Sequence, residues 1–169
     1  MPMPDLTALT DMKPFQSTAS KPEGILLTSA QERSAIILVV EDVHETRDGI
    51  ETLLTADGYT VAAARDQRDA IERAQRTTPD LILVGLAGTL REVIFGALSI
   101  RQGAALEERV ALVVFCAAEI DEGDEVAIGK NVHLTHPDNF NQVRGLIARL
   151  LNENAIAGGM VSPAKQGIL

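Results

Sequence analysis

Cysteine and basic charge are scarce in this sequence of 169 residues. The single cysteine, Cys116, excludes an internal disulfide and is compatible with a reducing compartment. Lysine and arginine total 15 against 24 acidic residues, which gives a net charge of −9. Because phosphate backbones and anionic membrane surfaces attract basic patches, this charge argues against nucleic-acid binding and against attachment to a membrane surface.

Long apolar runs are also missing. The longest, residues 110–118, falls well short of the roughly 20 residues that span a bilayer. Residues 1–22 show no basic start followed by an apolar stretch, so we expect no secretory signal. A cytoplasmic location is therefore the default expectation.

The composition is that of one soluble globular domain, with 46% hydrophobic and 23% charged residues. Residues 1–34 hold four of the 7 prolines and show no sustained period, which predicts a flexible N-terminal arm. Residues 153–169 contain Gly158, Gly159 and Pro163 and are predicted to be a flexible tail. The folded domain is therefore expected over residues 35–152.

Apolar strand patterns alternate with helical patterns through this domain. The expected strands span residues 35–40, 59–64, 81–84, 110–115 and 132–134. The expected helices lie before residue 58, at about residues 69–76 and 89–102, weakly at 122–128, and at 140–152. This alternation predicts an α/β fold, a doubly wound five-stranded parallel sheet with helices on both faces.

Ligand chemistry in such folds lies at the carboxyl ends of the strands. Glu41 and Asp42 follow the first strand, and Gly85 follows the third. Cys116 follows the fourth strand and His136 the fifth. These five residues are the candidate site.

Over residues 35–152 the sequence resembles the receiver domain of bacterial response regulators, the CheY-like family. The resemblance is distributed over many short matches. They are Leu38 to Asp42 with its acid pair, Arg47, Gly58-Tyr59, Asp66, Asp69-Ala70, Pro79 to Val84, Ile100-Arg101, Gly129, Leu134 and Pro137. The family implies a flavodoxin-like (βα)5 fold with strand order 2-1-3-4-5.

The resemblance also implies a chemistry that this sequence lacks. Receivers carry an aspartate at the end of the third strand, which accepts a phosphoryl group beside a magnesium ion. Gly85 occupies that position here, Cys116 replaces the family's hydroxyl residue, and His136 replaces its lysine. His133 stands where a switch aromatic is common. The sequence is therefore interpreted as a degenerate pseudo-receiver that has lost its phosphoacceptor.

Two alternatives concern the remaining polar residues. We expect no cofactor beyond a weakly held magnesium ion. Glu41 and Asp42 either hold this ion or cap the first helix. Together with the acid pair, Cys116 and His136 would form a metal or redox site, or a cysteine–histidine nucleophile. The other interpretation is that Cys116 is an ordinary residue of the packed core. A metal or redox sensor is thus the alternative function.

The main functional hypothesis is a stand-alone signalling module of the two-component or phosphorelay type that binds a protein and is not an enzyme. The partner would be a signalling protein, such as a histidine kinase or another regulator, or a second copy. Its expected contact face comprises His133, Gln142, Arg144 and Arg149, unless these residues are merely solvated. Any pH response is expected between about pH 5.5 and 7.5, carried by His133 or His136.

Overall fold

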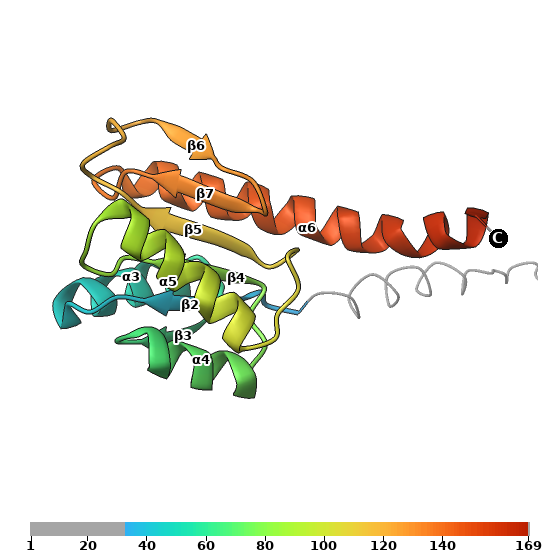
Figure 1. Ribbon diagram of the computed structural model, residues 1–169, viewed down its shortest axis with the longest axis horizontal. Helices are drawn as coiled ribbons and strands as arrows, with labels where there is room; N and C mark the ends of the chain where they lie inside the picture. The colour runs from blue at the N-terminus through green and yellow to red at the C-terminus, as the bar shows by residue number, and fades with distance from the viewer. Residues whose placement is uncertain (1–32, 169) are drawn as a thin grey trace, which may run out of the picture. The chain divides into compact units, whose positions relative to one another are not determined.

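In the computed structural model the described part of the chain runs from residue 33 to residue 168 (Figure 1). The predicted N-terminal arm therefore lies almost entirely outside the described residues. Within them, no helix has the length and apolar character needed to cross a membrane.

A six-stranded sheet organises this part of the chain, with the order β3-β2-β4-β5-β7-β6. The strands are β2 (Ile36–Val40), β3 (Thr60–Ala64), β4 (Leu81–Val84), β5 (Ala111–Phe115), β6 (Glu125–Ala127) and β7 (Val132–Thr135). Pairing is parallel except between β6 and β7. The predicted doubly wound parallel sheet and its 2-1-3-4-5 order are confirmed, and β6 is one strand more than predicted.

The extra strand replaces the helix that was expected over residues 122–128, so that prediction is wrong. Glu125–Ala127 pairs antiparallel with β7, with Glu125 opposite Thr135. Gly123 and Gly129 flank the strand with φ angles of +98° and +94°. Since these left-handed conformations cannot be part of a right-handed helix, they leave room only for a short extended segment.

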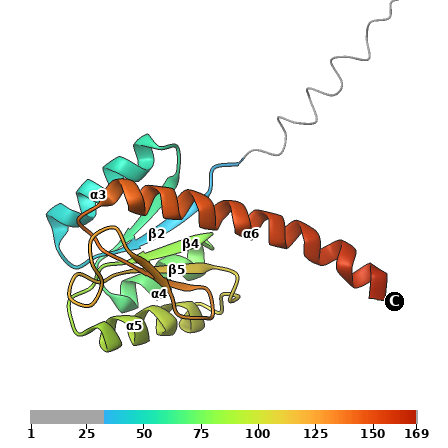
Figure 2. The ribbon, with the colours of Figure 1, turned by 90° about the horizontal axis from the view of Figure 1, so that it is seen from above.

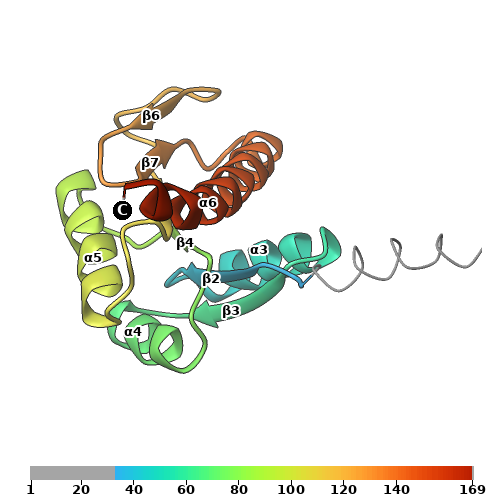
Figure 3. The same cartoon turned by 90° about the vertical axis from the view of Figure 1, so that its right-hand side faces the viewer.

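Helices cover both faces of the sheet, as Figure 3 shows. They are α3 (His44–Ala56), α4 (Gln67–Arg76), α5 (Leu90–Gly103) and α6 (Phe140–Ile168). The side chains of α3 and α6 share one buried cluster with alternate residues of the strands, and those of α4 and α5 share the other. Strands with both faces buried explain the continuous aliphatic runs of the sequence.

The starts of two helices follow from capping residues. Asp66 accepts a hydrogen bond from the backbone N–H of Asp69 at the start of α4. Thr89 and Glu92 form a reciprocal capping box at the start of α5. The loop after β4 therefore leads into a firmly fixed helix.

Helix α6 is longer than predicted, because it continues to Ile168 instead of ending at Asn152. Its contacts with the core end earlier: Ile147 is fully buried, whereas Ile156 is 54% exposed. Figure 2 shows the helix running on past the sheet. Residues 153–157 include good helix formers, which continue the helix past its last buried turn.

Candidate functional site

Three neighbouring strands bring most of the candidate residues to one edge of the sheet. Val40 pairs with Val84, and Val84 pairs with Val114. Glu41 and Gly85 are the next residues of their strands, so they lie side by side. Cys116 lies one residue farther along, just after β5. The Gly85 N–H donates to the Val40 carbonyl at 2.8 Å, which fixes this register at the site. The convergence expected from parallel strands is thus present for these three residues.

Glu41 occupies the space that a side chain at position 85 needs. A Cβ atom added to Gly85 would lie 2.5 Å from Oε2 of Glu41 and 3.0 Å from Cδ2 of Phe115. Both distances are shorter than ordinary van der Waals contact. Gly85 therefore packs closely against a carboxylate, and a larger residue there would require the Glu41 or Phe115 side chain to shift. The sequence alone did not reveal this contact of Glu41.

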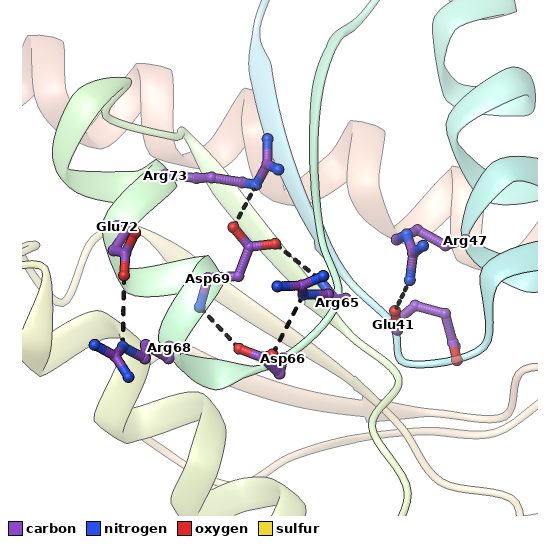
Figure 4. A network of polar contacts seen from close by, with 8 residues as sticks. All are labelled: Glu41, Arg47, Arg65, Asp66, Arg68, Asp69, Glu72 and Arg73. Atoms are coloured by element: carbon purple, nitrogen blue, oxygen red, sulfur yellow. Dashed lines mark hydrogen bonds and ion pairs between the residues drawn. The ribbon is translucent and has the colours of Figure 1, made fainter.

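The carboxyl group of Glu41 is buried and held by the backbone. The residue is 5% exposed, and its Oε1 accepts a hydrogen bond from the Val43 N–H at 2.9 Å. The Arg47 guanidinium donates at 2.7 Å to the Glu41 backbone carbonyl (Figure 4). Burial, reinforced by the neighbouring Asp42, raises the pKa of Glu41 above its usual value.

The acid pair does not cap α3 in the expected way. The N-cap residue is Val43, which makes no side-chain capping bond, and Asp42 is exposed. The remaining residues of Figure 4 form a separate polar network at β3 and α4, where Asp69 accepts from the Arg73 guanidinium at 2.8 Å. Glu41 is thus the member of the pair that belongs to the site.

Cys116 is buried and engaged with its own loop. Its thiol donates to Oε2 of Glu119 at 3.0 Å, and burial raises the pKa of the thiol. A thiol with a raised pKa is a poor nucleophile and a poor metal ligand, because both roles need the thiolate. Glu119 lies three residues beyond Cys116, and no sequence motif singled it out.

His136 also makes a local contact. Its side chain is 12% exposed, and its Nδ1 accepts a hydrogen bond from the Asp138 N–H at 3.2 Å. Among the described residues, no group of three or more His, Cys, Asp or Glu side chains is arranged to hold a metal ion. The structure therefore gives no support to the metal or redox alternative.

A pocket of about 490 Å³ opens beside Gly85. Its lining comprises residues 85–90, Val93, residues 115–119 and Pro137. Most of these side chains are apolar. Gly85 offers no carboxylate, and one oxygen of Glu41 already accepts the Val43 N–H. Since magnesium prefers six oxygen ligands in octahedral geometry, the residues at this edge do not fit a magnesium ion well.

The residues expected to form a partner face contact other parts of the chain. Gln142 donates to the Gly123 carbonyl at 2.7 Å, and Arg149 forms an ion pair with Glu125 on β6. Arg144 instead donates to Asp57, at the end of α3, at 2.7 Å. Two of the three side chains therefore contact the segment around β6, and the third contacts the end of α3.

His133 gives a testable pH dependence. Its Nε2 lies 3.1 Å from Oδ1 of Asn131, its Nδ1 is buried without a hydrogen-bond partner, and Glu125, Arg149 and Glu153 are the nearby charges. Burial lowers the pKa of His133, so the folded state takes up its proton at lower pH than the unfolded state. The free energy of unfolding should therefore fall as pH drops below about 6.5, towards the lowered pKa.

Urea unfolding from pH 5 to pH 8 checks this expectation. The variant His133→Phe should show a flatter dependence between about pH 5 and 6.5, because it removes the titrating group. Identical slopes for the parent and the variant would contradict the assignment to His133.

Comparisons with known proteins agree with the fold described above. Residues 37–87 match the model of the response regulator receiver domain. The chemotaxis protein CheY4 of Vibrio cholerae superposes with a TM-score of 0.55 at 21% identity, over 70% of this chain and 99% of that one. The chain has the receiver fold. A second similar structure is the anti-anti-sigma factor PhyR of Bartonella quintana, with a TM-score of 0.60 at 20% identity, over 82% of this chain and 56% of PhyR.

A third similar structure holds Mg²⁺ and BeF. The response regulator TrrA of Thermotoga maritima, in complex with Mg²⁺ and BeF, superposes with a TM-score of 0.53 at 18% identity, over 69% of this chain and 98% of that one. Identities this low show the shared fold alone.

Proposed function

We propose that this chain is a receiver-like signalling module that accepts no phosphoryl group and acts by binding another protein. The observation that carries the proposal is the contact between Gly85 and the Glu41 carboxylate. A receiver needs an aspartate nucleophile at the position of Gly85. This chain lacks that side chain, and a Cβ at the position would meet the Glu41 carboxylate unless the Glu41 side chain moved.

Two carboxylates that the third strand and the acid pair provide are poorly placed to replace the missing nucleophile. Asp80 lies at the opposite end of β4, where its Oδ2 accepts the Ile36 N–H at 2.8 Å. Glu41 is buried, and its raised pKa makes its carboxylate less available. Cys116 and His136, at the family's hydroxyl and lysine positions, are bonded to their own loops. Three positions that receivers use for phosphoryl transfer therefore lack the family's side chains here.

Without phosphoryl transfer, the output of the domain is a surface contact and not a catalytic step. The partner we propose is a signalling protein, such as a histidine kinase or another regulator. The binding conformation is then constitutive, because no phosphoryl group biases the equilibrium between two states. Only the partner can shift that equilibrium, by its difference in affinity for the two states. Binding should be equally strong with and without a phosphodonor.

Intact-mass measurement tests the phosphorylation part of this proposal. After incubation with acetyl phosphate and Mg²⁺, the mass of the full chain should be unchanged, because Gly85 provides no acceptor oxygen. A phosphorylatable receiver treated in the same tube serves as the positive control. A reproducible, acid-labile gain of one phosphoryl group would overturn the proposal.

A further inference from the structure

The pocket beside Gly85 has the size and the place of a small-molecule site. Its volume of about 490 Å³ lies within the roughly 300 to 1,000 Å³ that is usual for such sites. It opens between the loops that follow β4 and β5, at the carboxyl ends of two parallel strands. Ligands of doubly wound sheets bind at these ends. We call this cavity, with the lining given above, the Gly85 pocket.

The two loops give the Gly85 pocket an apolar interior. Small residues leave it open, and these are Gly85, Ala87, Gly88, Ala117 and Ala118. Larger apolar side chains, among them Val93 and Phe115, add surface to its lining. The apolar body of a ligand that enters the pocket therefore leaves water for apolar contacts, which is favourable.

Three carboxylates surround the Gly85 pocket. Glu119 belongs to its lining. Oε2 of Glu92 lies 3.4 Å from the place of a Cβ atom on Gly88, and Oε2 of Glu41 lies 2.5 Å from that of a Cβ atom on Gly85. Among the described residues that line the pocket, none is a lysine, an arginine or a histidine. The charge around the pocket is therefore negative, like the net charge of the chain.

The partners of Glu119 leave its negative charge in place. Its Oε2 accepts the Cys116 thiol at 3.0 Å, and a neutral thiol does not compensate a carboxylate. A neighbouring hollow of about 450 Å³ shares Thr89, Leu90 and Glu119 with the Gly85 pocket, and Arg91 lines that hollow. One positive charge thus stands beside three carboxylates.

The start of α5 does not reverse this charge. The N-terminus of a helix favours anions, and the capping box already supplies one. Oε2 of Glu92 accepts the Thr89 N–H at 2.8 Å and the Thr89 hydroxyl at 2.7 Å. The bond from the Thr89 N–H, reinforced by that from its hydroxyl, holds the pKa of Glu92 below its usual value, so Glu92 is ionised at neutral pH. The helix end is therefore already paired with a carboxylate.

From these observations we infer that the Gly85 pocket binds a small organic cation, with its ammonium group at Glu119 and its apolar body between the loops after β4 and β5. A bare metal ion does not fit, because no group of three or more His, Cys, Asp or Glu side chains among the described residues is arranged to hold one. The inference goes beyond the proposed function, since binding requires neither a phosphoryl group nor a protein partner.

Phenethylamine is the probe, because it carries an ammonium group on a small aromatic body. Amide NMR titration of the full chain should give saturable shifts concentrated on residues 85–90 and 115–119. Hydrocinnamate, which has a carboxylate on a similar body, should bind about tenfold or more weakly, since repulsion replaces attraction. Methylamine, which has the charge without the body, should also bind about tenfold or more weakly.

Two matched variants test the role of Glu119. Glu119→Gln should weaken phenethylamine binding about threefold or more and should change the binding of neutral phenethyl alcohol less than about twofold. Glu122→Gln removes an exposed acid that does not line the pocket, so it should change phenethylamine binding less than about twofold.

Four outcomes would each overturn the inference. They are shifts that map elsewhere on the chain, hydrocinnamate binding as tightly as phenethylamine, methylamine binding as tightly as phenethylamine, and equal losses from Glu119→Gln and Glu122→Gln.

Discussion

Gly85→Asp should destabilise the domain and should not restore phosphorylation. The new Cβ would lie 2.5 Å from Oε2 of Glu41, so Glu41 must leave its buried position or the strand ends must separate. The substitution also places a second carboxylate against one whose pKa burial already raises. Overpacking and the repulsion of two partly buried carboxylates together should lower the free energy of unfolding by on the order of 2 to 4 kcal/mol. Urea denaturation of the purified variant measures this change.

Two further variants separate the causes. Gly85→Ala introduces only the Cβ, so it should cost less than Gly85→Asp but more than an ordinary surface substitution. Adding Glu41→Ala to Gly85→Asp should recover part of the lost stability, since it removes the group that the new side chain meets. A Gly85→Asp protein as stable as the parent, or one fully phosphorylated by acetyl phosphate, would contradict this account of the site.

Truncating two isoleucines of α6 should give very different results. Ile147 is fully buried in the cluster formed by α3, α6 and the sheet, and Ile147→Ala should cost about 2 to 5 kcal/mol. Ile156 lies farther along the same helix and is 54% exposed. Ile156→Ala removes the same atoms from a solvated position and should cost less than about 0.5 kcal/mol.

The pair tests where the packed domain ends, because helix, residue type and substitution are matched. Thermal and urea unfolding of both variants give the two changes in stability. Similar losses would show that α6 beyond residue 152 packs against the domain, contrary to the boundary predicted from the sequence.

Most of the fold follows from local patterns in the sequence. The continuous aliphatic strands and the helix start at Thr89 were predictable because each depends on neighbouring residues. Helix α4 begins at Gln67, two residues before its predicted start. The segment at residues 122–128 was not, because its strand forms by pairing with β7 and its acidic residues gave a false helical signal. The length of α6 was not predictable in this way, because glycine and proline favour the end of a helix, and the backbone of α6 continues through them.

The site was predictable at the level of the backbone only. Parallel strands place Glu41, Gly85 and Cys116 at one edge whatever their side chains do. The directions of the side chains depend on local hydrogen bonds that spacing does not encode. Cys116 donates to Glu119, and His136 accepts from the Asp138 N–H. The alternative metal or redox cluster of Cys116, His136 and the acid pair therefore finds no support among the described residues.

The most direct test of the central claim is an amide NMR titration of the full chain with Mg²⁺ and beryllofluoride, which mimics the phosphoryl group on a receiver aspartate. The account predicts that the signals of residues 85–88 and of Cys116 stay unchanged, because the site lacks the acceptor carboxylate and a fitting set of magnesium ligands. Saturating shifts of these signals at one equivalent of the mimic, spreading to α5 and β7, would contradict it.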